Sequence, residues 1–435
     1  MAEPSVEDIR RARDDLDQVI SEIQAVPGFE DFLATPTMAD IEQAAREEPL
    51  VYLVAAVQGG LALIVWDGDV VHVPLDSLTA EALSTVVTDF LDVYAAYQAA
   101  SAGPSTSAEL KDSEASWNAC LDRTTRWLWD NVMGPVAARL DGQPGVVLVA
   151  GGRLGLLPLH AAWRPDASAP TGRRYLLDDL TVRYIPNARA LTAARALAAA
   201  PAQPMAVVSN PVRTDSLRPL TKAPVEAAAA MAAFPGAREL LGGSEATADR
   251  VRQALASAGA AHLACHGQAD RDSPLDSGLS LAGTDDLRLR DLLTMRLRLR
   301  LAVLSACETL PPGTDLPDEV VSLPTGLLQA GVGGIVASLW AVPDRATAML
   351  MIEFYRRWRW DKLTPAEALR RAQQWLRDTT NGEKIEQYRQ ALAAGAGWLP
   401  AQADNDLILA LEYADADDRG QGSLTAWAGF AYVGA

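Results

Sequence analysis

Cysteine, histidine and positive charge are scarce in this chain. Its 435 residues include three cysteines, Cys120, Cys265 and Cys307, and four histidines. Three scattered cysteines cannot form the dense disulfide framework of a small secreted domain, so the sequence favours a reducing compartment. Lys and Arg number 38 against 56 Asp and Glu, which gives a formal net charge of −18. Because nucleic acid and anionic membranes attract basic proteins, neither is expected as a partner.

Targeting signals and helical repeats are also absent from the sequence. The first residues are polar and acidic rather than basic and then apolar, so no signal peptide is expected. The most apolar stretch, 50–66, is shorter than the ~20 residues that span a bilayer. It also contains Gln58-Gly59-Gly60, which favours a β-hairpin over a membrane span. No helical repeat is visible. The sequence therefore predicts a soluble, cytoplasmic protein.

The chain is expected to comprise three parts, with one boundary in the Ala- and Pro-rich stretch 198–204. An amphipathic helix is predicted over 5–25, either packed on the body of the protein or docking a partner. The predicted parts are an N-terminal helical segment at 1–34, a first half at 35–198 and a second half at 199–435. In the second half strand-like and helical patterns alternate, which favours an α/β fold with a mostly parallel sheet flanked by helices.

Further element predictions concern segments of both halves. The first half is expected to contain a three-stranded meander over 50–73 and a helix from Thr79 to Ala100. A second helix is predicted from about residue 116, and a strand pair over 175–187. The chain is expected to end in a strand over 426–433.

Two apolar runs in the second half end in reactive side chains. They are Ala261-His262-Leu263-Ala264-Cys265-His266-Gly267 and Leu301-Ala302-Val303-Leu304-Ser305-Ala306-Cys307-Glu308-Thr309. Each run predicts a buried strand of a parallel sheet. Because ligands bind at the carboxyl ends of such strands, His266 and Cys307 are expected to share one crevice. An imidazole beside a thiol holds it as the nucleophilic thiolate. The alternative is that Cys307 is an inert buried thiol.

Spacing around the first run also raises the question of a metal site. On a helix, His262, Cys265 and His266 would form one ligand cluster. The flanking Ala-Leu-Ala favours a strand, on which His262 and His266 share one face and Cys265 points the opposite way. We therefore expect no metal site. Cys265 is interpreted as a core residue and His262 as a buried polar group bonded to a neighbouring element.

The motifs around these runs resemble the CHAT domain, a branch of the caspase-like cysteine peptidases that includes separases. The matching segments occur in the family's order and are His266-Gly267, Pro274-Leu275, Ser277-Gly278-Leu279-Ser280-Leu281, Leu304-Ser305-Ala306-Cys307-Glu308-Thr309, Ala337-Ser338-Leu339-Trp340, Phe354-Tyr355, Glu367-Ala368-Leu369-Arg370 and Trp427-Ala428-Gly429-Phe430. The resemblance implies a caspase-like fold for residues 199–435. It also implies that residues 35–198 form an inactive, pseudo-protease-like α/β half that supports the catalytic sheet.

The resemblance and the chemistry of the residues give the same catalytic roles. Cys307 attacks the scissile carbonyl and His266 transfers the proton. The backbone N–H groups of Gly267 and Cys307 form the oxyanion hole. No cofactor and no metal is expected.

Several residues are candidates for the first specificity pocket. Ser338 and Trp340 resemble the strand that lines this pocket in caspase-like peptidases. Asp344 follows shortly after them, and Asp270 and Asp272 lie in the loop after His266. A carboxylate at the pocket floor would select Lys or Arg in the substrate. The alternative is that all three are solvated loop charges or helix caps, with Asp344 capping a helix over 345–359.

The sequence therefore predicts a cysteine endopeptidase that cleaves a protein partner through a Cys-His dyad. At family level this implies regulated proteolysis, such as bacterial defence or cell death, with an activating or recruiting protein subunit as a further partner. Two alternatives stay open. One is a catalytically silent caspase-like module that binds a peptide, and the other is a hydrolase or transferase that uses the same dyad on a small molecule.

Overall fold

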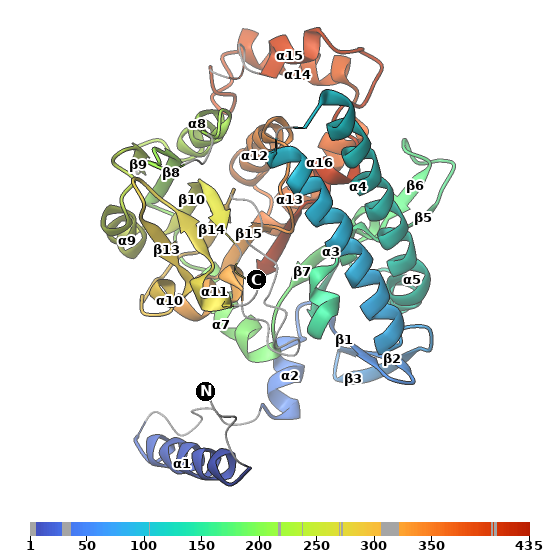
Figure 1. The fold of residues 1–435 in the computed structure, drawn as a ribbon, viewed down its shortest axis with the longest axis vertical. Coiled ribbons are helices and arrows are strands. Elements are labelled where there is room, and N and C mark those ends of the chain that lie inside the picture. The colour runs from blue at the N-terminus through green and yellow to red at the C-terminus, as the bar shows by residue number, and fades with distance from the viewer. Residues whose placement is uncertain are drawn as a thin grey trace.

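The chain is built around one large, mostly parallel β-sheet (Figure 1). The computed structural model describes residues 6–27, 36–103, 105–215, 219–236, 238–268, 270, 273–305, 322–401, 403 and 407–435. Within these residues the sheet has 11 strands. In spatial order they are β3 (Asp69–Leu75), β2 (Gly59–Trp66), β1 (Leu50–Ala56), β4 (Gly145–Ala150), β7 (Thr181–Tyr184), β16 (Phe430–Gly434), β15 (Gly334–Ser338), β14 (Leu301–Leu304), β10 (Ala260–Ala264), β8 (Met205–Pro211) and β9 (Arg238–Gly243).

The two halves of the chain meet inside this sheet. The last strand, β16, lies between β15 of the second half and β7 of the first half. It runs antiparallel to β15, with Val336 opposite Tyr432, and parallel to β7, with Val433 opposite Tyr184. The other antiparallel pairs among the described strands of this large sheet are β1–β2 and β2–β3. The predicted α/β fold with a mostly parallel sheet is confirmed.

The meander predicted over 50–73 is confirmed as β1, β2 and β3. Asp67 and Gly68 both have positive φ, 53° and 80°, as a tight turn between two antiparallel strands requires. The meander is followed by α3 (Ala80–Ala102) and α4 (Ser107–Leu128). The start of α4 was predicted too late, at about residue 116. Thr106 and Glu109 form a capping box that begins the helix at Ser107.

Helical turns and short hairpins complete the first half. The helical path of α4 continues through a π-helical turn, η1 (Trp129–Met133), into α5 (Gly134–Ala137). Short 3-10 helices η2 (Gly152–Leu156) and η3 (Leu159–Ala161), a hairpin of β5 (Trp163–Pro165) and β6 (Arg173–Tyr175), and α7 (Ala188–Ala198) follow.

Two strand predictions were partly wrong. The strand pair predicted over 175–187 is interrupted by α6 (Leu176–Asp179), because the Asp178 carboxylate accepts a hydrogen bond from the Tyr175 N–H and starts a helical turn there. The predicted final strand begins later than expected. Residues 424–427 form α16 (Leu424–Trp427), so β16 starts at Phe430.

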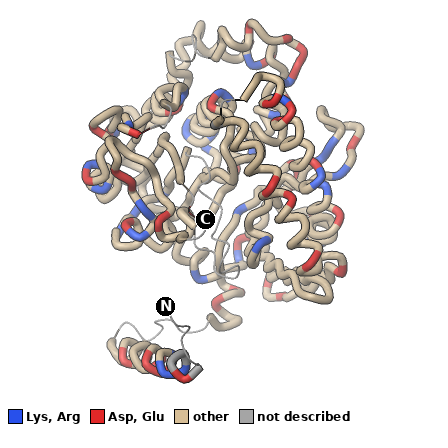
Figure 2. Tube along the Cα trace, in the orientation of Figure 1, with Lys and Arg blue, Asp and Glu red and all other residues tan. Residues whose placement is uncertain are grey.

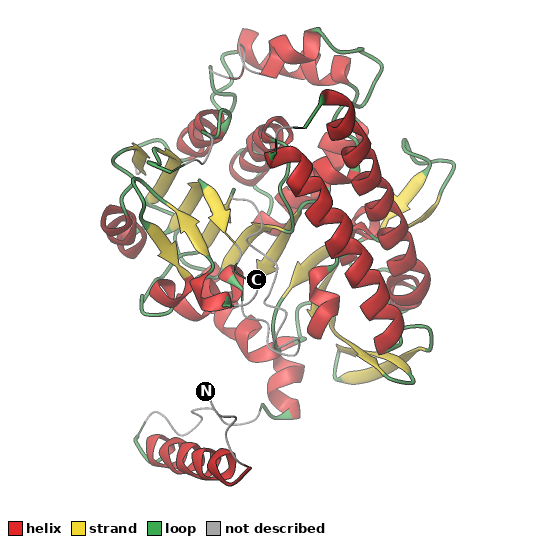
Figure 3. Cartoon of the chain, in the orientation of Figure 1, coloured by secondary structure: helices red, strands yellow, loops and turns green. Residues whose placement is uncertain are grey.

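Helices and a small sheet surround the second half of the large sheet (Figure 3). The helices are α8 (Ala223–Ala233), α9 (Ala248–Ser257), α10 (Leu289–Leu292), α11 (Leu323–Ala330), α12 (Asp344–Arg359), α13 (Pro365–Asp378), α14 (Asn381–Ala393) and α15 (Leu409–Glu412). The small sheet contains β11 (His266–Gln268), β12 (Gly278–Ser280) and β13 (Asp286–Arg288), and the 3-10 helix η4 (Pro274–Asp276) precedes β12.

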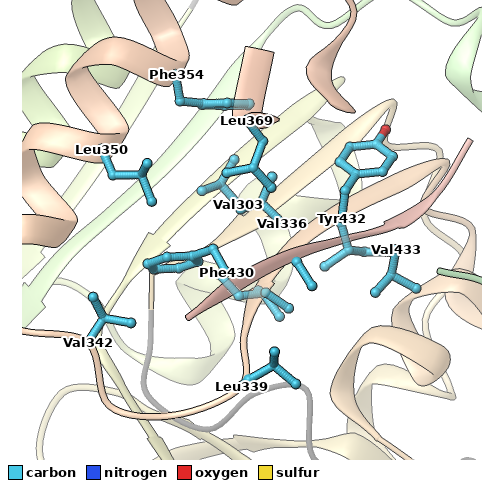
Figure 4. Close-up of a cluster of buried hydrophobic side chains, with 14 of the residues drawn as sticks. Val303, Val336, Leu339, Val342, Leu350, Phe354, Leu369, Phe430, Tyr432 and Val433 are labelled. Carbon is cyan, nitrogen blue, oxygen red and sulfur yellow. The ribbon is translucent and has the colours of Figure 1, made fainter. Parts of the chain in front are cut away.

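Hydrophobic side chains cover both faces of the sheet. Successive side chains of a strand point to opposite faces, and Leu50 and Val51 of β1 accordingly belong to different clusters. Leu50 packs with α7 and with α2 (Met38–Ala44) in the smaller cluster. Val51 belongs to the larger core, which also contains Val303, Val336, Phe354 and Leu369 (Figure 4). The functional groups described below lie at the edge of this rigid core.

The N-terminal helix α1 (Val6–Gln24) lies apart from the sheet and its flanking helices (Figure 1). Leu16 and Val19 are 56% and 50% exposed. Both acidic and basic residues occur along α1 (Figure 2). Of the two predicted roles for this helix, packing on the sheet body is not observed. No helix of the described chain is long and apolar enough to cross a membrane.

Candidate active site

The predicted catalytic histidine follows the buried strand β10. β10 pairs in parallel with β14, with His262 opposite Val303 and Leu263 opposite Leu304, so the carboxyl ends of the two strands adjoin. After Ala264 the chain leaves the large sheet. His266 and Gly267 begin β11 of the small sheet, where they pair with Ser280 and Leu279. Both are partly exposed.

At Cys265 the chain passes from the large sheet to the small sheet, and this corrects one expectation. His262 and His266 were predicted to share one face of a single strand, but they lie on strands of two different sheets. Cys265 is 1% exposed and packs within the larger core, as its interpretation as a core residue requires. It also lines the pocket described below.

The predicted nucleophile lies just beyond the described part of β14. This strand ends at Leu304, and Ser305 is the last described residue before position 322. Cys307 follows two residues after Ser305 and falls outside the described residues. The structure thus shows where the chain leading to Cys307 leaves the sheet, next to the strand that leads to His266.

A pocket opens where these strands end. The space between its lining atoms, open solvent included, is about 360 Å³. Its lining residues come from the ends of strands and from the helices around them: Leu220, Glu226, Cys265, Ser305, Ser338, Trp340, Val342, Asp344, Thr347 and Phe430. Three of the predicted substrate-binding residues, Ser338, Trp340 and Asp344, are therefore brought together in one cavity beside the path to Cys307.

The other two predicted substrate-binding residues have different positions. Asp270 is not among the described residues that line the pocket, and its carboxylate accepts a hydrogen bond from the Ser273 N–H at 2.8 Å within its own loop. Asp272 falls outside the described residues. A role in substrate binding stays a prediction for both.

Asp344 is the exposed carboxylate of the pocket. It is the first residue of α12, whose N-cap is Pro343, so the alternative that Asp344 itself caps the helix is wrong. A carboxylate in the first turn still interacts favourably with the helix dipole. The Thr221 hydroxyl lies 3.5 Å from its Oδ2.

Glu226 is a second pocket carboxyl, which sequence reasoning missed. It lies on α8, is 4% exposed, and accepts a hydrogen bond from the Ser305 hydroxyl. Burial raises the pKa of Glu226 to about 8, the nearby charge of Asp344 adds to the rise, and the bond from Ser305 opposes it. Its carboxyl is therefore mostly protonated at neutral pH. A single acidic residue in the Ala-rich run Ala223-Pro224-Val225-Glu226-Ala227 was the signal that could have revealed it.

A buried histidine lies close to Glu226. His262 Nδ1 shares a hydrogen bond of 3.0 Å with the hydroxyl of Tyr355 on α12, and His262 Nε2 lies 3.7 Å from Glu226 Oε2. Burial lowers the pKa of His262 to about 3, so the ring is neutral. Its interpretation as a buried polar group bonded to a neighbouring element is confirmed. Among the described residues no cluster has the ligands to hold a metal ion.

Comparisons with known proteins agree with this architecture. A family model described as the CHAT domain matches residues 122–435. No curated protein matches the sequence. Two crystal structures of the Saccharomyces cerevisiae separase–securin complex share the fold, with TM-scores of 0.58 and 0.54 at 9% and 10% sequence identity. The alignments cover 91% and 85% of this chain but only 30% and 31% of the matched chains.

A further match is the crystal structure of the Arg-specific cysteine proteinase gingipain R, with 10% identity, covering 82% of this chain and 75% of that one. Its TM-score of 0.38 is too low to show a shared fold. At identities near 10%, the likeness to separase concerns the fold alone. The family match covers well over half of the sequence and includes both strands that lead to the predicted dyad. The chain therefore belongs to the CHAT domain family, and its fold is the caspase-like one that the motifs predicted.

Proposed function

We propose that this chain is a cysteine endopeptidase that cleaves a protein partner, with Cys307 as nucleophile and His266 as general base and acid. One observation carries the proposal: His266 follows β10 with only Cys265 between them, and Ser305, two residues before Cys307, lies directly after the neighbouring parallel strand β14. Membership of the CHAT family and a caspase-like fold support it.

The mechanism follows from the chemistry of this pair. His266 takes the thiol proton, and the Cys307 thiolate attacks the scissile carbonyl carbon. The backbone N–H groups of Gly267 and Cys307 stabilise the oxyanion, each by about 3 kcal/mol. His266 then donates its proton to the leaving amine, which breaks the peptide bond and leaves a thioester on Cys307. Water activated by His266 hydrolyses the thioester and restores the thiol.

The pocket favours a basic side chain in the residue before the cut. Asp344 supplies an exposed carboxylate, and the buried Glu226 lies on the same cavity. Apolar groups of Trp340, Val342 and Phe430 line it as well and would pack on the methylene stem of Lys or Arg. A cation beside Glu226 would favour loss of its proton, so both carboxyls would then be charged.

The partner and the biological role are proposed from the family and the fold. The separase structures contain securin, which shows that protein in a complex with a protein partner. We infer that this chain likewise acts on a protein or peptide in the cytoplasm, in regulated proteolysis such as bacterial defence or cell death. Recruitment would use the exposed helix α1 or an activating subunit.

Turnover of a mixed peptide library by the wild type, Cys307→Ala and His266→Ala tests this proposal. We expect cleavage after Lys or Arg by the wild type, and a loss of at least about a thousandfold in both variants. Iodoacetamide labelling near neutral pH provides a second measurement. Cys120 and Cys265 are buried and serve as internal controls, and burial raises the pKa of Cys120 to about 11. No cleavage together with an unreactive Cys307 would instead favour a silent peptide-binding module.

A further inference from the structure

Residues 340–342 form one wall of the pocket. Through Trp340 this wall packs against helices that precede the family-matched region. That region begins at residue 122, whereas α3 and most of α4 come earlier in the chain. Trp340 is fully buried, and its ring lies 5.7 Å from the ring of Trp117 on α4 and 6.4 Å from that of Phe90 on α3. The same residue lines the pocket. One side of this wall thus faces the cavity and the other contacts the α3–α4 hairpin.

A hydrogen bond fixes the backbone of the same wall. The Ala341 N–H donates to the hydroxyl of Tyr94 on α3 at 2.8 Å. Ala341 lies beyond the end of β15, between the pocket residues Trp340 and Val342. Having left the sheet, this N–H needs another acceptor, and the 2% exposed Tyr94 supplies it.

A second contact ties the hairpin to the wall through α16. The indole N–H of Trp340 donates to the carbonyl oxygen of Thr425 at 3.0 Å. The hydroxyl of Thr425 donates in turn to Asn118 Oδ1 on α4, also at 3.0 Å. The backbone of Ala341 thus bonds directly to the α3–α4 hairpin, and the side chain of Trp340 is connected to the hairpin through Thr425.

We propose that the α3–α4 hairpin positions the specificity pocket and that Tyr94 is the positioning residue for its wall. The inference rests on the proposed function in taking this pocket as the site of the substrate side chain. Tyr94 contacts the pocket wall through its hydrogen bond with Ala341, the residue next to Trp340. A loosened wall lowers the affinity for substrate, whereas His266, which lies at the start of β11, keeps its position. A protein that moved the hairpin would change substrate affinity by the same route.

Tyr94→Phe tests the proposal because it removes the hydroxyl and keeps the ring, which lies 4.9 Å from Trp117. The matched control is Tyr97→Phe, one turn further along α3, whose ring stacks on the same Trp117 at 6.4 Å. We expect KM to rise about tenfold in Tyr94→Phe, the equivalent of ~1.4 kcal/mol for one lost hydrogen bond, with kcat changed less than about twofold. Tyr97→Phe should match the wild type. Equal KM values for the two variants, or a fall in kcat alone, would overturn the proposal.

Hydrogen–deuterium exchange separates this inference from the proposed activity. In Tyr94→Phe the Ala341 amide should exchange about tenfold faster, with the effect confined to residues 339–343, and Tyr97→Phe should leave it unchanged. A wild type that neither cleaves peptides nor reacts at Cys307, but shows this exchange pattern, would refute the endopeptidase and still support the role of the hairpin in fixing the pocket wall. Unchanged Ala341 exchange in Tyr94→Phe would overturn the anchor whatever the activity.

Discussion

The Ser305 hydroxyl donates a hydrogen bond to the buried carboxyl of Glu226. Ser305 directly follows β14, two residues before the proposed nucleophile, and Glu226 lies on α8 beside the pocket. This contact connects the protonation of a buried acid to the segment that leads to Cys307. The fold tolerates the acid because it is mostly protonated, and that state depends on pH.

Replacing Glu226 by Gln should make the protein more stable at alkaline pH. The pKa of Glu226 is about 8 in the folded chain and near 4.5 in the unfolded chain, so the folded state binds the proton more tightly. Its contribution to stability is therefore present below pH 4.5 and is lost as pH rises to about 8, with a slope of at most about 1.4 kcal/mol per pH unit.

Urea unfolding of the wild type and Glu226→Gln at pH 5, 7 and 9 measures this effect. The free-energy difference between the two proteins should shift in favour of the variant from pH 5 to pH 9. Because other groups titrate alike in both proteins, they cancel in the difference. A difference that stays constant with pH would show that Glu226 is charged in the folded chain throughout.

Asp344→Asn should reduce cleavage after basic residues. It removes the exposed pocket charge and keeps the side-chain volume, so kcat/KM for Lys or Arg substrates should fall about 10- to 100-fold, as expected for the loss of a charged contact. Peptides with an uncharged residue before the cut should be much less affected. Asp249→Asn, on the exposed surface of α9, is the control. Equal losses for basic and neutral peptides would exclude Asp344 as a specificity residue.

Gly429→Ala should destabilise the protein and disturb the pocket wall. A Cβ at position 429 would overlap the Val342 side chain and approach Trp340 Nε1 to 3.0 Å, and both neighbours line the pocket. Overpacking of this kind costs about 1–3 kcal/mol. Gly397→Ala is the matched control, since a Cβ there meets no atom within 4 Å. In thermal unfolding Gly429→Ala should melt at a lower temperature than Gly397→Ala. Similar melting temperatures would show that the side chains around position 429 adjust with no loss of stability.

Local patterns predicted much of the fold. Apolar segments separated by turn residues located the meander β1–β3, and uninterrupted apolar runs located β10 and β14. The same runs predicted His266 at the end of a strand; the structure places it two residues after β10 ends, as the first residue of β11. The late prediction for α4 arose because the capping residues Thr106 and Glu109 lie in a stretch whose Ser, Gly and Pro content resembles a loop. The change of sheet at Cys265 depends on pairing with β12, which no local pattern reveals.

Long-range contacts explain the parts of the site that sequence reasoning missed. Ser338, Trp340 and Asp344 were predicted from a motif and do line one pocket. Glu226 was missed because its partner Ser305 lies 79 positions away. Tyr94 and Ala341 are separated by 247 positions. Such pairs arise from the packing of distant elements, so a single sequence carries no direct sign of them.

A thiol-reactive peptide probe tests the central claim most directly. The probe carries Arg before an acyloxymethyl ketone, which alkylates an active-site thiolate, and mass spectrometry locates the adduct. The account predicts an adduct on Cys307 in the wild type, about tenfold slower labelling in Asp344→Asn, and at least about a hundredfold slower labelling in His266→Ala. Labelling of Cys307 at the same rate in the wild type and His266→Ala, or no labelling of Cys307, would contradict the proposed dyad.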